Sequence, residues 1–345
     1  MGKYSGGYFF EDYAVGMRLV HATPRTLTDG DRALYTALYP SRFALSSADS
    51  FAERCGLPRS PMDDLAVFHT VFGKTVPDIS LNAVANLGYA EGRFLAPVYA
   101  GDTLASTSEV IGLKETSSGK TGIVWVRTEG RNQRDETVLS YVRWVMVKKR
   151  DAANPAPEAV TPTLADAVSA DALIVPAGLQ FSDYDKAAAG SPHVWADYAP
   201  GERIDHVDGV VIEEAEHMMA TRLWQNTARV HFDPAARGGA PRLVYGGHII
   251  SLARGLSFNG LANAQRIAAI NGGSHAAPCF AGDTVYAWSE VLDRAETAEP
   301  SVGALRLRLV AVKNRDASDF PLRGDDGKYA EGVVLDLDYW ALIPR

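Results

Sequence analysis

The sequence predicts an α+β protein made of two similar halves, each an antiparallel sheet wrapped around one central helix. Three observations support this fold class: a long internal duplication, one buried-helix pattern per copy, and alternating strand segments that close each copy. The chain has 345 residues, 46% of them hydrophobic and 22% charged, which is typical of a soluble globular protein large enough for two domains. We therefore predict an N-terminal domain over residues 1–150, a linker over 151–190 and a C-terminal domain over 191–345.

The duplication rests on two pairs of matching blocks. EDYAVGMRLVH, starting at Glu11, matches ADYAPGERIDH, starting at Ala196, so the offset is 185 residues. FLAPVYAGDTLASTSEV, starting at Phe94, matches HAAPCFAGDTVYAWSEV, starting at His275, so the offset is 181. The segment between the copies is rich in Pro and Ala and has no clear amphipathic period, which indicates a linker.

Each copy shows the same order of expected elements. A short strand and a polar helix come first, and an apolar helix follows over Pro61–Val76 in one copy and Gly246–Leu261 in the other. The apolar residues of the second helix cover much of its circumference, so we expect it to be buried on most sides. Strands close each copy: Leu and Arg alternate over 305–309, and Leu and Asp over 335–338, which predicts one buried and one solvated face.

One segment differs between the copies in a way that bears on chemistry. The stretch WQNTARVHFD (224–233) aligns with YPSRFALSSA (39–48) at the offset of 185. Asn226 then lies on Ser41, and His231 lies on Ser46. Because His titrates near neutral pH, the second copy keeps a group suited to proton transfer that the first copy lacks.

Composition excludes several functional classes. The net charge of −8 and the absence of a basic run argue against a nucleic-acid partner. The chain has no run of 18 apolar residues, so we expect no membrane span, and its start lacks the apolar core of a signal peptide. Cys55 and Cys279 are too few for a disulfide framework, so we expect a cytoplasmic protein. No His, Cys or carboxylate cluster has metal-ligand spacing, so we expect no metal and no cofactor.

The repeated FLAPVYAGDTL and HAAPCFAGDTV segments, together with the order of elements, resemble the MaoC-like hydratase family. That family commonly carries F-x-x-P-V-x-x-G-D-x-L after its buried helix. The first copy matches this run at Phe94, Pro97, Val98, Gly101, Asp102 and Leu104. The resemblance covers nearly the whole chain outside the linker and implies two fused hotdog folds.

The family's hydratase motif, approximately Gly-Asp-x-Asn-Pro-x-His, places its Asp on Asn226 and its His on His231. Gln225, Ala228 and Arg229 replace the Gly, Asn and Pro, so only the His is retained. This variant resembles a narrower branch, the mesaconyl-C1-CoA hydratases, also called β-methylmalyl-CoA dehydratases. The resemblance implies a hydro-lyase that reversibly hydrates a short branched dicarboxylic enoyl group, with the substrate carried as a coenzyme A thioester and no further cofactor.

The chemistry assigns roles to these residues. His231 is the expected general acid/base, and Asn226, which cannot ionise at neutral pH, would orient the water. The enolate oxygen needs backbone N–H donors at a helix N-terminus, and Gly246, Gly247 and His248 are the candidates. The family's donor position falls on His248, one residue past the two glycines, which leaves the identity of the donor open.

Other residues carry weaker expectations. In the first copy Asp63 and Asp64 would put negative charge where an anion should sit, which supports an inactive, mainly structural first half. His275 is expected to be a strand histidine with satisfied hydrogen bonds, and Asp102 and Asp283 are expected to shape turns. The candidates for binding the substrate carboxylate or a coenzyme A phosphate are Arg229, Arg237 and Arg242.

Competing functions within the same fold remain open. An (R)-type hydratase of straight-chain enoyl-CoA would use the same residues, and a hotdog thioesterase would hydrolyse the thioester instead. A non-catalytic acyl-CoA sensor is disfavoured because His231 is kept beside a glycine-led helix. The sequence also allows a homo-oligomer of the double-hotdog unit.

Overall fold

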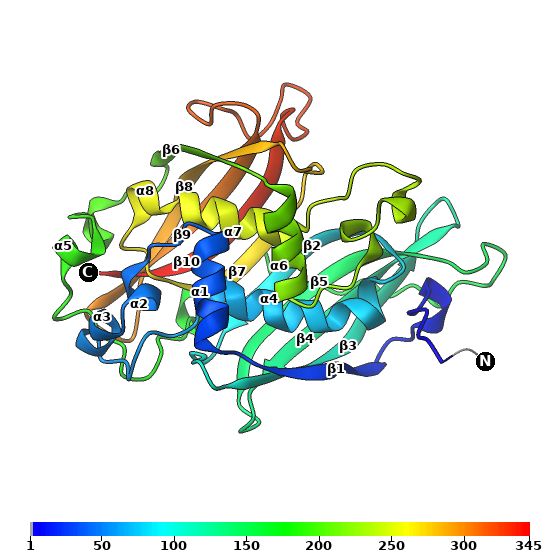
Figure 1. Ribbon diagram of the computed structural model, residues 1–345, viewed down its shortest axis with the longest axis horizontal. Helices are drawn as coiled ribbons and strands as arrows, with labels where there is room; N and C mark the ends of the chain where they lie inside the picture. The colour runs from blue at the N-terminus through cyan, green and yellow to red at the C-terminus, as the bar shows by residue number, and fades with distance from the viewer. Residues whose placement is uncertain (1–2) are drawn as a thin grey trace.

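The computed structural model describes residues 3–345 and contains a single antiparallel sheet of ten strands (Figure 1). The strand order across the sheet is β1-β3-β4-β5-β2-β7-β10-β9-β8-β6. The first half supplies β1 Arg18–Thr26, β2 Ala83–Phe94, β3 Thr103–Glu115, β4 Thr121–Arg131 and β5 Thr137–Lys148. The second half supplies β6 Arg203–Val211, β7 Arg266–Ser274, β8 Thr284–Glu296, β9 Val302–Lys313 and β10 Val333–Pro344.

The two halves are arranged as equivalents about the centre of the sheet. Each half has five strands, numbered here by their order along that half. Counted from the edge of the sheet to its centre, both halves place them in the order first, third, fourth, fifth, second. At the centre, β2 and β7 pair with Tyr89 opposite Gly273 and Gly92 opposite Ile270. These two pairs map onto each other through the offset of 181, so an approximate two-fold axis passes between β2 and β7. Positions that the duplication equates therefore occupy equivalent places.

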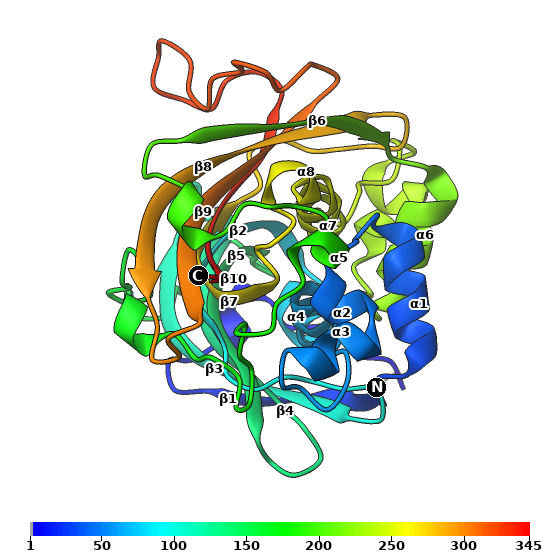
Figure 2. The same ribbon diagram turned by 90° about the vertical axis from the view of Figure 1, so that its left-hand side faces the viewer.

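The longer helices lie on one side of the sheet in two layers (Figure 2). Figure 2 shows the curved sheet around α4 and α7, with α1 and α6 beyond them. Helices of the first half are η1 Phe10–Asp12, α1 Asp29–Leu38, α2 Ala44–Ser47, α3 Asp49–Arg54, α4 Asp64–Thr75 and η2 Val76–Ser80. Helices of the second half include α6 Glu214–Leu223, η5 Arg229–His231, η6 Pro234–Arg237, α7 Gly246–Leu256 and α8 Phe258–Leu261.

Both predicted central helices are present, with shorter bounds. Every residue of α4 is buried, as is all of α7 after its first residue, as the apolar pattern predicts. Asp63 is the N-cap of α4, because its carboxylate accepts a hydrogen bond from the Leu65 N–H at 2.9 Å. The continuous helix predicted to reach Leu261 is wrong. It is interrupted because Gly260 has φ of 99° and Asn259 is extended.

The closing strands have the predicted alternation. Leu305 and Leu307 of β9 are buried, whereas Arg306 is partly exposed and pairs with Asp338 of β10 at 2.7 Å. The apolar side chains face the central helices and the ion pair lies on the outer face, so the period of two in the sequence reports the two faces directly.

The repeated AGDT segments form turns, as predicted. The carboxylate of Asp102 accepts a hydrogen bond from the Tyr99 N–H at 2.9 Å, and Asp283 does the same with Phe280. The family-like run around Asp102 therefore spans the end of β2, this turn and the start of β3.

The segment between the halves is packed against the sheet. It contains only short helices: η3 Ala170–Ala172, α5 Lys186–Ala189 and, at its end, η4 Trp195–Asp197. Leu179 and Phe181 are buried, and Val160 bridges to Leu113 of β3. The exact linker bounds stay a prediction, but this segment packs against the rest of the protein along part of its length. Within residues 3–345, none of the helices combines the length and the apolar character that crossing a membrane would require.

Candidate functional site

The site begins where α6 ends against α4. Trp224 is fully buried, and its carbonyl lies so close to Gly73 of α4 that a Cβ on Gly73 would overlap it. Gln225 then adopts φ of 53°, which turns the chain sharply. The tight approach to α4 and this turn direct Asn226 into the space between the two halves.

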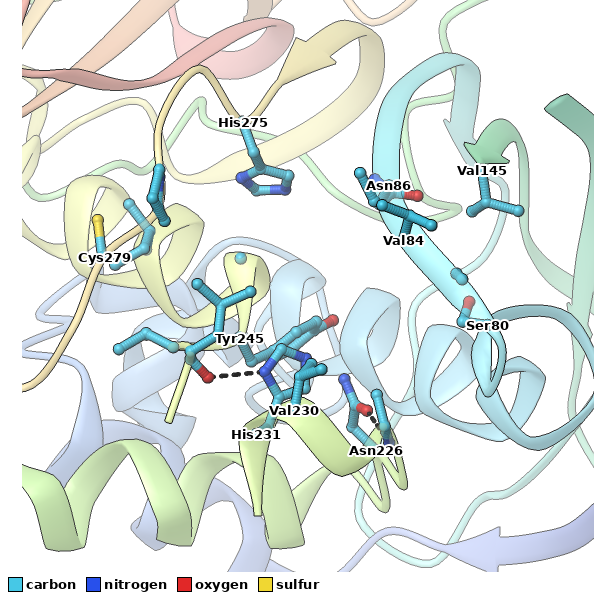
Figure 3. Close-up of a pocket in the computed structure, with 18 of the residues that line it drawn as sticks. Ser80, Val84, Asn86, Val145, Asn226, Val230, His231, Tyr245, His275 and Cys279 are labelled. Carbon is cyan, nitrogen blue, oxygen red and sulfur yellow. Dashed lines mark hydrogen bonds between the residues drawn. The ribbon is translucent and has the colours of Figure 1, made fainter. Parts of the chain in front are cut away.

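Asn226 is held with its amide oxygen occupied. The Ala228 N–H donates to the Asn226 side-chain oxygen at 3.0 Å, which makes a local turn. Because a backbone N–H can donate only to the amide oxygen, the NH₂ group of Asn226 is the half of the amide that remains free. Figure 3 shows this NH₂ group pointing toward His231. Asn226 therefore presents hydrogen-bond donors to the cavity, without charge.

His231 ends the short helix η5 with its ring orientation fixed. Its Nδ1 donates to the Leu243 carbonyl at 2.7 Å, and the Leu243 N–H donates to the Val230 carbonyl at 3.0 Å. With the proton on Nδ1, Nε2 carries a lone pair. Burial lowers the pKa of His231 from 6.5 to about 4, so the imidazole is neutral at pH 7.

The start of α7 forms the next part of the wall. Of the three predicted thioester-binding residues, Gly246 lines the cavity, whereas Gly247 and His248 do not. The His248 N–H already donates to the Tyr245 carbonyl at 2.9 Å, and its ring contacts the Tyr39 hydroxyl at 3.2 Å. The structure therefore disfavours His248 as the donor and leaves the glycine N–H groups at the first turn of α7.

These residues surround a cavity of about 310 Å³ between the two halves (Figure 3). The second half contributes Asn226, Ala228, Val230, His231, Leu243, Val244, Tyr245, Gly246, Ile249, His275, Ala276, Ala277, Pro278, Cys279 and Val334. The first half contributes Phe72, Val76, Ser80, Ala83, Val84, Ala85, Asn86, Tyr89, Arg143 and Val145. This volume suits a small acyl group rather than a long chain. No Asp or Glu occurs among these lining residues.

His275 differs from its prediction. It lies just after β7 rather than inside a strand, and its ring enters the cavity opposite His231 (Figure 3). Its Nε2 lies 3.2 Å from the Tyr89 hydroxyl, and burial lowers the pKa of His275 to about 4. A Cβ on Gly246 would lie 2.5 Å from this ring, so the absence of a side chain at 246 makes room for it.

The equivalent place in the first half is almost filled. A cavity of about 10 Å³ lies there, beside Ser46, Asp64 and Arg266. Asp64 is the first residue of α4, as Gly246 is the first residue of α7. Arg266 on β7 is equivalent, at the offset of 181, to Ala85 on β2. Asp64 forms a buried ion pair with Arg266 and also accepts from the Ile267 N–H at 2.8 Å. A space of this size holds at most one water molecule.

The three predicted anion-binding arginines lie outside the cavity lining. Arg229 is exposed, Arg242 pairs with Glu214, and Arg237 lies 5.3 Å from the Phe280 ring. These positions do not support binding of the substrate carboxylate inside the cavity. Contact with coenzyme A outside it stays a prediction.

The sequence reasoning missed three polar residues of the first half. Ser80, Asn86 and Arg143 line the cavity from η2, β2 and β5. A signal for Arg143 was present: in the strand segment SYVRWVMV it shares the inward register with Tyr141, Val145 and Val147, where an apolar residue is expected. No comparable pattern marks Ser80 or Asn86.

Comparison with known proteins identifies relatives over the full chain. The family model described as mesaconyl-CoA hydratase matches residues 3–322. A mesaconyl-CoA hydratase of Cereibacter sphaeroides is 67% identical over 99% of this chain and 100% of its own length. A β-methylmalyl-CoA dehydratase of Chloroflexus aurantiacus is 61% identical over 99% of both chains.

Solved structures agree with the sequence relatives. A MaoC domain protein dehydratase from Chloroflexus aurantiacus superposes with a TM-score of 0.97 and 60% identity, covering 100% of this chain and 99% of the other. A Mycobacterium tuberculosis protein described as having a double hotdog fold gives a TM-score of 0.78 at 26% identity, with 99% of both chains covered. The predicted α+β double-hotdog fold and the predicted hydro-lyase class are confirmed. This chain belongs to the mesaconyl-CoA hydratase family.

Proposed function

We propose that this chain reversibly hydrates mesaconyl-C1-CoA to β-methylmalyl-CoA, with His231 as the general acid/base. The observation that carries this proposal is the fixed ring of His231, whose Nδ1 donates to Leu243 while the ring borders a 310 Å³ cavity. The names of the full-length relatives support the substrate. The absence of a metal or cofactor requirement and a cytoplasmic location stay predictions.

Hydration needs a base for water and a proton for the α-carbon. Nε2 of His231 would take a proton from water as the oxygen attacks the β-carbon, and the same nitrogen would then return that proton to the α-carbon. Because the imidazole is neutral before the reaction, it starts in the state that accepts a proton. Atoms balance with one water added and no other reactant.

The enolate oxygen develops charge as water attacks. The Gly246 and Gly247 N–H groups lie in the first turn of α7, and neither donates to a backbone acceptor in the described structure. Donors at a helix N-terminus stabilise such an oxygen electrostatically. We assign the thioester carbonyl to this end of the cavity, with Gly246 as the nearer residue.

Asn226 would hold the water by donation. Its NH₂ group is the free part of the amide, so it can donate to the water oxygen and leave the water protons for His231. An aspartate there would instead place negative charge near the attacked carbon, which in mesaconyl-C1-CoA bears the free carboxylate. We also propose that the first half, with its nearly filled equivalent site, catalyses no reaction of its own.

The test compares mesaconyl-C1-CoA and crotonyl-CoA as substrates of wild type and His231→Ala. Loss of absorbance of the conjugated thioester and the mass gain of one water report hydration. His231→Ala should lower kcat by about 10²–10⁴-fold on both substrates because positioned acid–base catalysis contributes that much.

The control is His193→Ala, which removes an exposed histidine outside the cavity lining and should leave kcat unchanged. Full activity in folded His231→Ala would exclude the proposed mechanism. A preference for crotonyl-CoA would favour the straight-chain hydratase, and release of free coenzyme A thiol would indicate a thioesterase.

A further inference from the structure

Arg143 is a fully buried cation without a carboxylate partner. Its side chain, on β5, is 0% exposed, and it also lines the cavity. Nη2 donates to the Thr75 hydroxyl at 2.7 Å, but Nε and Nη1 have no partner in the described structure. Buried arginines are usually paired, and an unpaired buried charge is costly. This arginine therefore has two nitrogens without acceptors, Nε and Nη1, in a side chain that lines a cavity a ligand can enter.

The aromatic surroundings of Arg143 do not replace an anion. The guanidinium carbon lies 4.2 Å from the centre of the Phe72 ring, which gives a cation–π contact. Burial lowers the pKa of Arg143, yet an arginine side chain stays protonated in proteins. The ring contact occupies one face of the guanidinium, while the edge that carries Nε and Nη1 stays without an acceptor.

Two neighbouring polar side chains are also without partners. Neither the amide nitrogen nor the amide oxygen of Asn86 makes a hydrogen bond in the described structure, and the Ser80 hydroxyl makes none. Asn86 pairs across the sheet with Val145, two residues from Arg143 on the same face of β5. Figure 3 shows Asn86 and Ser80 on the wall facing Asn226 and His231. Unused donors therefore gather on the side of the cavity that the first half supplies.

We infer that Arg143, assisted by Asn86 and Ser80, binds the free carboxylate of a dicarboxylic acyl-CoA substrate and so selects it over neutral enoyl thioesters. This inference rests on the proposed function. Arg143 is the only Arg, Lys, Asp or Glu among the residues lining the cavity, so the wall has a single fixed charge, and it is positive. A guanidinium matches a carboxylate in shape and charge.

Neutralising this carboxylate would also assist the chemistry. In mesaconyl-C1-CoA the carboxylate is attached to the β-carbon, and its negative charge disfavours attack by water there. An arginine bound to it withdraws that charge and makes the β-carbon more electrophilic. Arg143 is a specificity-determining residue in this scheme, whereas the bond-making steps remain with His231.

The other half of the molecule lacks this device. Arg143 lies opposite Tyr89 on β2, and the equivalent of Tyr89 at the offset of 181 is Ile270 on β7. Tyr339 of β10 lies opposite Ile270. The equivalent strand position therefore carries a neutral tyrosine, on the side of the sheet's centre that borders the nearly filled site. The arginine occurs only on the strand that faces the open cavity.

The experiment measures kcat/KM of wild type, Arg143→Gln and Arg143→Lys on mesaconyl-C1-CoA and crotonyl-CoA. Arg143→Gln should lower kcat/KM for mesaconyl-C1-CoA by about 100-fold or more, the usual effect of removing one partner of a buried charge pair. Crotonyl-CoA, which has no carboxylate, should change less than about fivefold. Arg143→Lys, which keeps the charge but loses the fork of donors, should recover part of the preference.

Arg306→Gln is the matched control, because it removes a paired arginine on the outer face of β9 and should leave both activities unchanged. Equal losses on both substrates in Arg143→Gln would assign a structural role and overturn the inference, as would an undiminished preference for mesaconyl-C1-CoA. Circular dichroism checks folding. If Arg143→Gln does not fold, Arg143→Lys decides, and it must weaken mesaconyl-C1-CoA more than crotonyl-CoA.

The two levels of the proposal fail differently. A wild-type enzyme that hydrates crotonyl-CoA but not mesaconyl-C1-CoA overturns the proposed function, and this inference with it. If wild type prefers mesaconyl-C1-CoA and Arg143→Gln keeps the same preference, the inference alone is overturned.

Discussion

Replacing Asn226 by aspartate adds one negative charge to the cavity wall while nearly preserving side-chain size. The side chain is 2% exposed, so the charge would be poorly solvated. One carboxylate oxygen can keep the hydrogen bond from the Ala228 N–H. The other would stand where the NH₂ group now faces the cavity, so a donor becomes a charged acceptor. The change thus tests electrostatics with little change in packing.

The magnitude follows from Coulomb's law. Two unit charges about 6 Å apart at an effective dielectric constant of about 20 repel by about 3 kcal/mol. That energy corresponds to a reduction of about 100-fold in kcat/KM for a substrate with a carboxylate on the attacked carbon. A neutral crotonyl thioester feels no such repulsion, so its kcat/KM should change only a few-fold.

The same substitution should alter the pH dependence. A carboxylate near His231 favours the imidazolium, so the pKa of His231 should rise from its present value of about 4. The acid limb of kcat/KM should therefore move to higher pH in Asn226→Asp. In wild type the limb should lie near pH 4, well below the ordinary histidine value of 6.5.

The assay is kcat/KM on both substrates from about pH 3.5 to 8, which includes the wild-type acid limb, with Asn226→Ser as the neutral control. Serine is the residue at the equivalent position 41, and it should lower both activities alike. Equal losses on the two substrates in Asn226→Asp would refute the electrostatic explanation for an amide at this position. An unmoved acid limb would show that His231 does not sense residue 226.

Two further predictions concern stability. Arg266→Ala should lower the free energy of unfolding by about 3–5 kcal/mol, because Asp64 would remain buried without its partner. Urea unfolding measures this loss, and the double variant Asp64→Leu with Arg266→Met should restore most of the stability. A nearly unchanged free energy of unfolding in Arg266→Ala would contradict a buried ion pair. Five histidines with a pKa of about 3 or 4 are neutral in the folded state: His69, His206, His231, His248 and His275. Their unfolded pKa is about 6.5, so the unfolded state binds more protons between pH 6.5 and 4, and each should cost about 1 kcal/mol of stability on going from pH 7 to 5.5. Urea midpoints at these two pH values test the sum of about 5 kcal/mol, and pH-independent midpoints would mean that these histidines are not held neutral.

The site could be located from the sequence only in part. Local spacing indicated Asn226 and His231 because the family motif and the duplicated frame both fall on one short loop. The sequence left three candidates for the N–H donor to the thioester oxygen at the start of α7. A local pattern can predict where a helix begins, but it cannot predict which acceptor each N–H binds. The structure shows that the His248 N–H is already used.

His275 shows a second limit of sequence reasoning. Its alignment with Phe94 in the duplication predicted an ordinary strand histidine. The ring instead enters the cavity because β7 ends at Ser274 and because Gly246 has no side chain to block it. Neither the end of the strand nor the contact with a glycine 29 positions earlier follows from a local pattern.

By itself, the sequence determined the two-fold architecture, the faces of the strands, the AGDT turns and the loop that carries His231. These features repeat with short periods or fixed offsets, because they depend on backbone geometry and on burial of one face. Only the tertiary structure decided that one site is open and the other nearly filled, and that Arg143 faces the open one. Those outcomes depend on which side chains meet across β2, β5 and β7, where residues far apart in the chain are brought together by the sheet.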